Sequence, residues 1–110
     1  MGRTNFLGEF EELILTMVLI IGEEAYGNTV VKAIKEHQGR DVNLSSVHIT
    51  LYRLEEKGFL ESYMGGATKA RGGRKKRYFK ITDAGKVLLQ EMKDSRTNLW
   101  KLAPQLNFSS

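Results

Sequence analysis

The chain has 110 residues and an apolar fraction of 41%, so it can bury one core and leaves little room for a second domain. It has no cysteine, which excludes disulfides, cysteine-ligated zinc sites and thiol catalysis and is typical of a protein in a reducing compartment. Its net charge of +4 is local, because a basic segment without any acid runs from Lys69 to Lys80 while the rest of the chain has more acids than bases. Such a segment favours a polyanion-binding surface over a merely solvated loop.

The longest apolar run covers residues 13–21, is interrupted by Thr16 and has about half the length needed to cross a bilayer. Glu9, Glu11 and Glu12 precede it, where a signal peptide would carry positive charge. We therefore predict a soluble, cytoplasmic protein without a membrane partner.

Residues 1–8 predict a loose lead-in, and a helical pattern begins at Glu9 and ends at Gly22. Leu15, Leu19 and Ile20 add apolar positions on the other side of this helix. A helix that is apolar on nearly all faces must bury most of its surface, and one small core cannot bury that much. The sequence therefore indicates that a second chain packs against this helix. The helical spacing is carried by Phe10, Leu13, Ile14, Met17, Val18 and Ile21.

A second helix is expected to begin near residues 26–28 and to stop around Gly39. A short polar connection is expected over residues 41–44, with one or two extended residues. The inner face of this helix is formed by Val30, Val31 and Ile34.

A third helix is expected after this connection, with Ser45 or Ser46 as its N-cap, because a serine hydroxyl can accept a free amide of the first turn. Gly58 closes it. Its buried stripe consists of Val47, Leu51 and Leu54, spaced at i, i+4 and i+7.

After Gly58, aromatic and branched residues favour strands over residues 59–64 and 77–81. The segment between them, residues 65–76, is glycine-rich and basic, which predicts a β-hairpin with a long tip. Thr82 or Asp83 is expected to cap a last helix. The apolar positions of that helix are Val87, Leu88, Met92, Leu99 and Leu102.

The predicted order is three helices, two strands and one helix, which describes a mainly α (α+β) winged helix-turn-helix with a two-stranded β wing and a C-terminal dimerisation helix. The predicted boundaries are a lead-in at 1–8, a DNA-binding domain at 9–81, the dimerisation helix at 82–103 and a tail at 104–110.

Three stretches resemble the PadR family of bacterial transcriptional regulators. The first is Ala25-Tyr26-Gly27, and the second runs from Leu44-Ser45-Ser46 through the Leu-Tyr-Arg-Leu-Glu-Glu-Lys-Gly-Phe-Leu ending at residues 51–60. The third joins Gly-Gly-Arg-Lys-Lys-Arg-Tyr-Phe at 72–79 to Ile-Thr-Asp-Ala-Gly at 81–85. One departure concerns the third helix, where this chain has His48-Ile49 and many family members have Tyr-Pro.

The resemblance covers roughly residues 9–95 and is closest to the short branch of the family, with a single C-terminal helix. It implies a homodimer held by the first and last helices. It also implies repression of a nearby operon, often relieved by a small hydrophobic or aromatic ligand.

The outward face of the third helix is the candidate reader of double-stranded DNA, since a helix fits the major groove. A serine hydroxyl can bond a phosphate or a base, a tyrosine can donate to the backbone, an arginine can pair with guanine or phosphate, and an isoleucine can touch a thymine methyl. An ordinary solvated helix face has the same periodicity. The candidate contacts are Ser46, His48, Ile49, Tyr52 and Arg53.

The predicted wing supplies cations for the DNA backbone or the minor groove. A nucleotide-binding P-loop does not fit, because Gly73 is followed by Arg74-Lys75-Lys76 and then by a strand. The candidate wing contacts are Arg71, Arg74, Lys75, Lys76 and Arg77.

The chain is not expected to be an enzyme or to hold a metal or a cofactor. His37 and His48 are its only histidines and lie on different predicted helices, whereas a metal site needs three or four ligands. No set of nucleophile, base and acid can be identified.

The first and last helices carry candidates for the dimer contact, or for a ligand pocket between subunits. Trp100 fits dimer packing first, because large aromatic side chains bury extensive area. A ligand platform is the alternative. The candidates are Phe6, Phe10, Met17, Leu88, Met92, Leu99 and Trp100.

The leading functional prediction is a dimeric, sequence-specific repressor that binds a palindromic operator. The alternatives are a winged-helix adaptor that binds protein, and a non-specific DNA or RNA binder, which the acidic body disfavours.

Overall fold

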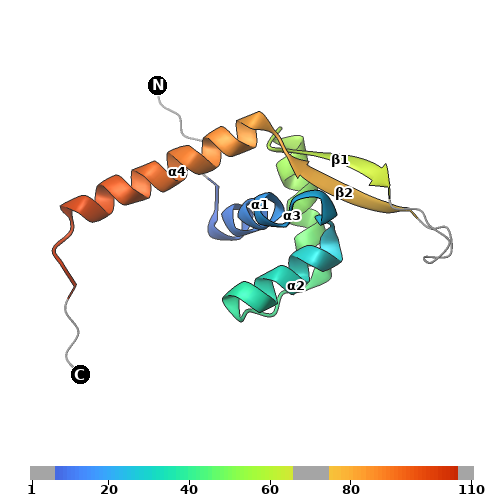
Figure 1. Cartoon of the computed structure of the whole chain (residues 1–110), viewed down its shortest axis with the longest axis horizontal. Coiled ribbons are helices and arrows are strands. Elements are labelled where there is room, and N and C mark those ends of the chain that lie inside the picture. Colours follow the sequence, from blue (N-terminus) through green and yellow to red (C-terminus); the bar gives the residue numbers. More distant parts are fainter. Residues whose placement is uncertain (1–6, 66–74, 107–110) are drawn as a thin grey trace.

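A computed structural model describes residues 7–65 and 75–106. Three helices pack together, a hairpin projects from one side of them, and a long helix runs away on the other side (Figure 1). The fold is the predicted winged helix-turn-helix. In chain order the elements are α1 (Glu9–Ile21), the 3-10 turn η1 (Gly22–Glu24), α2 (Gly27–Gln38), α3 (Leu44–Glu56), β1 (Leu60–Gly65), β2 (Lys76–Ile81) and α4 (Asp83–Leu102).

The predicted helix ends agree with the structure except at the start of α3. Gly22 and Gly39 end α1 and α2 with positive φ, as expected of glycine. The N-cap of α3 is Asn43, so the prediction of Ser45 or Ser46 was wrong. The Asn43 side-chain oxygen accepts from the Ser46 N–H at 3.0 Å, because it precedes that amide by the three residues a capping side chain spans.

The core lies where α1, α2 and α3 meet the hairpin. The predicted inward stripe of α3 is fully buried, and Val30 and Ile34 of α2 are buried against it. The largest fully buried side chains of this core are Phe79, Ile14, Leu15, Ile34, Leu51, Leu54 and Leu60. This packing fixes which face of α3 remains free.

The hairpin pairs β1 with β2 in antiparallel register, with Leu60 opposite Ile81 and Gly65 opposite Lys76. On its other edge, the Phe79 N–H donates to the Ala25 carbonyl oxygen at 2.9 Å. This bond ties the base of the hairpin to the segment between α1 and α2. The hairpin therefore leaves the helical body at a fixed point.

The first turn of α1 carries three acids that reach three other parts of the fold. Glu9 pairs with Arg40 at 2.8 Å, Glu11 pairs with Lys57 at 2.9 Å, and Glu12 accepts two bonds from Arg96, each at 3.0 Å. These pairs link α1 to the α2–α3 connection, to the end of α3 and to α4. Such partly exposed pairs contribute little energy each but orient the elements that they join.

Among the described residues, no single helix is long and apolar enough to span a membrane. Glu9–Glu24 and Gly27–Gln38 reach the required length and composition when taken together, but the two are bent by 116° against each other.

Candidate nucleic-acid interface

The predicted contacts of α3 share its free face. Ser46, His48 and Arg53 are exposed, and the exposed fractions of Ile49 and Tyr52 are 57% and 45%. The opposite face is buried at Val47, Thr50, Leu51 and Leu54. A helix held on one side and bare on the other has the form needed to enter a groove.

Gly27 allows α3 to lie very close to the start of α2. A Cβ built on Gly27 would overlap the His48 imidazole and would lie 3.0 Å from a methyl carbon of Leu44. His48 is thus exposed on one side and rests on the α2 backbone on the other. Its position on the free face depends on the absence of a side chain at residue 27.

The cations at the outer end of the paired wing strands β1 and β2 contact aromatic side chains of the helices. The Lys76 ammonium lies 4.8 Å from the centroid of the Tyr26 ring, and the Arg77 guanidinium lies 5.7 Å from that of Tyr52. Because neighbouring strand residues point to opposite faces, Lys76 lies towards α2 and Arg77 towards α3. The structure therefore brings Arg77 and Tyr52, two predicted contacts, side by side.

The remaining wing predictions divide between described and undescribed residues. Lys75 is exposed directly before β2. Arg71 and Arg74 lie outside the described residues, as does most of the predicted glycine-rich tip.

Two polar residues that the sequence did not single out connect α3 to the wing. The Ser62 hydroxyl donates to Glu55 Oε2 at 2.6 Å and accepts from Arg77 Nη1 at 3.0 Å. Neither residue type nor spacing signals this chain of bonds, because its members come from α3, β1 and β2.

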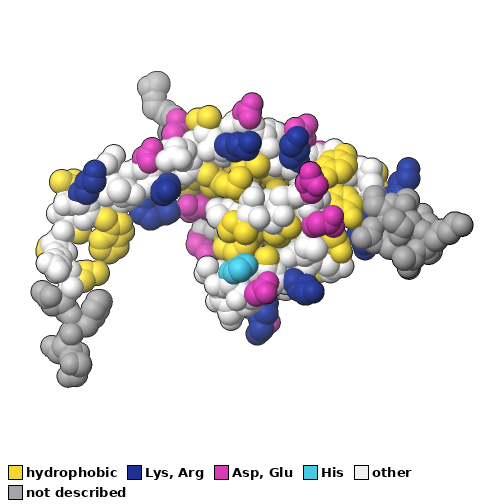
Figure 2. All heavy atoms as spheres, in the orientation of Figure 1, with side chains coloured by type: hydrophobic (Ala, Val, Ile, Leu, Met, Phe, Trp, Pro, Cys, Tyr) yellow, Lys and Arg dark blue, Asp and Glu magenta, His cyan; other side chains and the backbone are white. Residues whose placement is uncertain are grey.

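The candidates for a dimer contact or ligand pocket are not brought together within one chain. Met17, Leu88 and Met92 lie in the core of the chain, and Phe10 is half-buried. Leu99 and Trp100 are 65% and 58% exposed on the projecting half of α4. Figure 2 shows hydrophobic side chains at the surface of this half. Phe6 lies outside the described residues.

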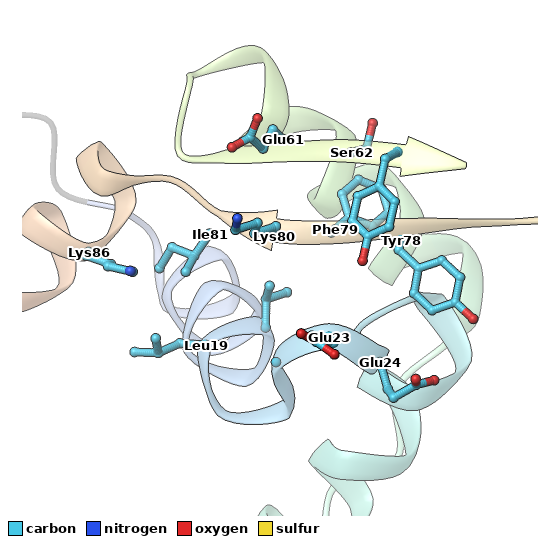
Figure 3. A pocket seen from close by; sticks show the side chains of 13 residues that line it. Leu19, Glu23, Glu24, Glu61, Ser62, Tyr78, Phe79, Lys80, Ile81 and Lys86 are labelled. Carbon is cyan, nitrogen blue, oxygen red and sulfur yellow. The ribbon is translucent and has the colours of Figure 1, made fainter. Parts of the chain in front are cut away.

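A groove of about 760 Å³ lies between η1, the end of α1 and the hairpin (Figure 3). Leu19 and Ile81 supply apolar lining, Tyr78 forms part of the wall, and Glu23 and Glu61 add carboxylates. None of the described candidates for the ligand pocket lines this groove. No sequence pattern predicts this groove, because its lining comes from segments far apart in the chain.

The folded structure perturbs the carboxyl group of Glu11. Burial would raise the pKa of its carboxyl, but bonds from Lys57 and from the Gly8 N–H, and the charges of Lys57 and Arg53, outweigh that effect and lower the pKa. This group supports the fold behind α3 rather than a reaction. Within residues 7–65 and 75–106, no cluster of three or more His, Asp or Glu side chains is placed to hold a metal ion.

A free α3 face beside a basic two-stranded wing defines the winged helix-turn-helix class. Residues 15–91 match the Transcriptional regulator PadR-like family, and the chain belongs to this family of transcriptional regulators, as its motifs predict.

Solved structures agree with this assignment. A PadR family transcription regulator from hypervirulent Clostridium difficile is 25% identical, with a TM-score of 0.69 over 86% of this chain and 94% of that chain. A PadR-like transcriptional regulator from Bacillus cereus is 26% identical, with a TM-score of 0.67 over 84% and 85% of the two chains. Bacillus subtilis PadR, solved in complex with operator DNA, is 20% identical over 92% of this chain and 52% of its own, with a TM-score of 0.63, and shares the fold.

Proposed function

We propose that this chain is a sequence-specific DNA-binding repressor that acts as a homodimer in the cytoplasm, with α3 in the major groove and the wing on the backbone or in the minor groove. One observation carries the proposal: the bare face of α3 adjoins the basic wing, with Arg77 over Tyr52. Such a surface suits DNA, because a helix fits the major groove and the cations of the wing suit phosphate. The operator complex of Bacillus subtilis PadR, a relative with the same fold, supports it.

The homodimer is supported by the projecting half of α4. Its apolar side chains Leu99, Trp100 and Leu102 are 65%, 58% and 83% exposed, which is unusual for so short a segment unless another surface covers it. One side of the helix carries Lys93, Arg96 and Lys101 around Trp100, and the other carries Glu91 and Asp94 near Leu99 and Leu102. Two copies can therefore pair apolar side chains and opposite charges.

The effector in this proposal is a small hydrophobic or aromatic molecule bound between subunits, where Leu99 and Trp100 are the exposed candidates for its walls. Titration of a panel of aromatic compounds, followed by Trp100 fluorescence, tests this part. An unchanged spectrum across the panel contradicts it, and release of bound DNA by a binding compound supports relief of repression.

DNA binding is tested by selecting bound sequences from a random pool. A palindrome with fixed half-site spacing is expected, because a two-fold dimer presents two α3 helices. Lys75→Ala should lower the log–log salt slope by about one unit and weaken all sequences about equally, since Lys75 is expected to contact phosphate. Arg53→Ala should instead change the preference among sequences.

Lys101→Ala is the matched control, because it removes the same charge from α4, far along the chain from the wing. It should leave the salt slope unchanged. If no sequence is enriched and neither Lys75→Ala nor Arg53→Ala alters DNA binding, the chain is a protein-binding adaptor instead.

A further inference from the structure

A polar chain crosses from the recognition helix α3 to both strands of the wing. Arg77 Nη1 of β2 donates to the Ser62 hydroxyl of β1 at 3.0 Å, and that hydroxyl donates to Glu55 Oε2 of α3 at 2.6 Å. Arg77 is one of the cations expected to meet DNA, whereas Glu55 and Ser62 are half-buried. The cation is therefore held by residues that lie behind it.

The strand register explains why these side chains meet. Ser62 pairs with Phe79 and Met64 pairs with Arg77, so Ser62 and Arg77 are diagonal neighbours on one face of the hairpin. Phe79 on the same face packs edge-on against Tyr52, with ring centroids 5.8 Å apart. Tyr52 thus contacts both Phe79 and Arg77, and this face of the hairpin is the one that lies on α3.

We propose that Glu55 and Ser62 are positioning residues that hold Arg77 over Tyr52 and so fix the wing against α3 for DNA recognition. A serine hydroxyl can accept one bond and donate another at the same time, which lets it join a guanidinium to a carboxylate. Both bonds involve a charged partner, and such bonds are stronger than neutral ones. The proposal rests on the DNA-binding function proposed above.

Fixing the wing matters because α3 and the wing must reach different parts of one duplex together. If Arg77 loses its bond to Ser62, its side chain must be ordered when DNA binds, and this ordering costs side-chain entropy. This cost weakens the operator complex, in which α3 and the wing must both be correctly placed on the DNA. Binding to other sequences is dominated by general charge attraction and depends less on register.

The test compares Ser62→Ala with Ser62→Thr. Ser62→Ala removes both bonds and should weaken operator binding about fivefold, while binding to unrelated DNA changes less than about twofold. Ser62→Thr keeps the hydroxyl and should restore operator binding. Glu55→Gln keeps an acceptor but loses the charge and should have a smaller effect, with Glu56→Gln, the exposed neighbour, as its matched control.

A double-mutant cycle distinguishes positioning from other roles. The effect of Ser62→Ala should nearly disappear in an Arg77→Ala background, because Ser62 acts through Arg77. Additive effects of the two substitutions, equal losses on all DNA, or no effect of Ser62→Ala each overturn the proposal.

The free protein supplies a readout that needs no DNA. NMR signals of the Arg77 side-chain N–H groups should show hindered rotation and protection in the wild type and in Ser62→Thr, and should lose both in Ser62→Ala. If the NMR signals show that the Arg77 side chain already rotates freely in the wild type, the positioning role is overturned, whatever the protein binds. Failure of the wild type to select any DNA, with Arg77 restrained, overturns the DNA-recognition role together with the proposed function.

Discussion

The two halves of α4 differ in what covers them. The first half is held in the fold, with Gly85 against the Phe59 carbonyl and Leu88 and Met92 in the core. The second half leaves the body (Figure 1), and hydrophobic side chains lie on its surface (Figure 2). Trp100 is one of the exposed apolar residues there. One continuous helix therefore has one half that stabilises the wing and a second half that only another surface can bury.

The strongest way to test the first half is Leu88→Ala. Leu88 is 6% exposed, so its truncation leaves a cavity and should lower the free energy of unfolding by about 3 kcal/mol. Denaturant unfolding measures the loss. Val87→Ala is the control, because Val87, at the preceding position, is 56% exposed and its truncation should lower the free energy of unfolding by less than about 0.5 kcal/mol. Equal losses at both positions would mean that the first half is not packed as described.

The second half is tested by Trp100→Ala. If Trp100 packs against a second copy, its removal should weaken the dimer by about 2 kcal/mol, a roughly thirtyfold rise in the dimer dissociation constant. Sedimentation over a range of concentrations measures this. Lys86→Ala, at an exposed position on the first half of α4, should leave dissociation nearly unchanged. A Trp100→Ala chain that associates like the wild type would falsify the role of this half in the dimer.

The smallest expected effect concerns the turn of α1 that supports both α4 and α3. Since the folded protein lowers the pKa of Glu11, the stabilisation from this carboxylate is present at neutral pH and is lost as pH falls from its ordinary value of 4.5 through the lowered one. Glu11→Gln should reduce stability at pH 7 by less than about 1 kcal/mol and flatten the acid limb of the stability curve. Unfolding measured at several pH values tests this. A similar stability curve for Lys57→Gln would attribute the pH-dependent stabilisation to the pair of Glu11 and Lys57. An unaltered acid limb in Glu11→Gln would rule out a contribution of Glu11 to acid unfolding.

The elements were predictable because their signals are local. Glycines at 22 and 39 end helices through their own backbone freedom, and Val47, Leu51 and Leu54 identify the inner face of α3 by spacing alone. The cap of α3 was missed because Asn43, Ser45 and Ser46 are all good capping residues, and only the position of the first turn decides between them.

The site was predictable only in part. Apolar spacing placed Met17, Leu88 and Trp100 together among the candidates for a dimer contact or ligand pocket. Spacing alone cannot distinguish a side chain buried in the core of its own chain from one exposed on the surface. The links from Glu55 through Ser62 to Arg77 are fixed by strand register and helix packing. No pattern along the chain carries that information.

The contact between Gly27 and His48 limits how this protein can acquire new DNA preferences. His48 belongs to the face proposed to read DNA, yet its imidazole also packs against the backbone of Gly27 at the start of α2. A new side chain at residue 48 must therefore fit against the start of α2 as well as contact a base. Ile49, which is 57% exposed, projects from the same helix with more freedom. Divergence of operator choice should thus proceed more readily through residue 49 than through residue 48.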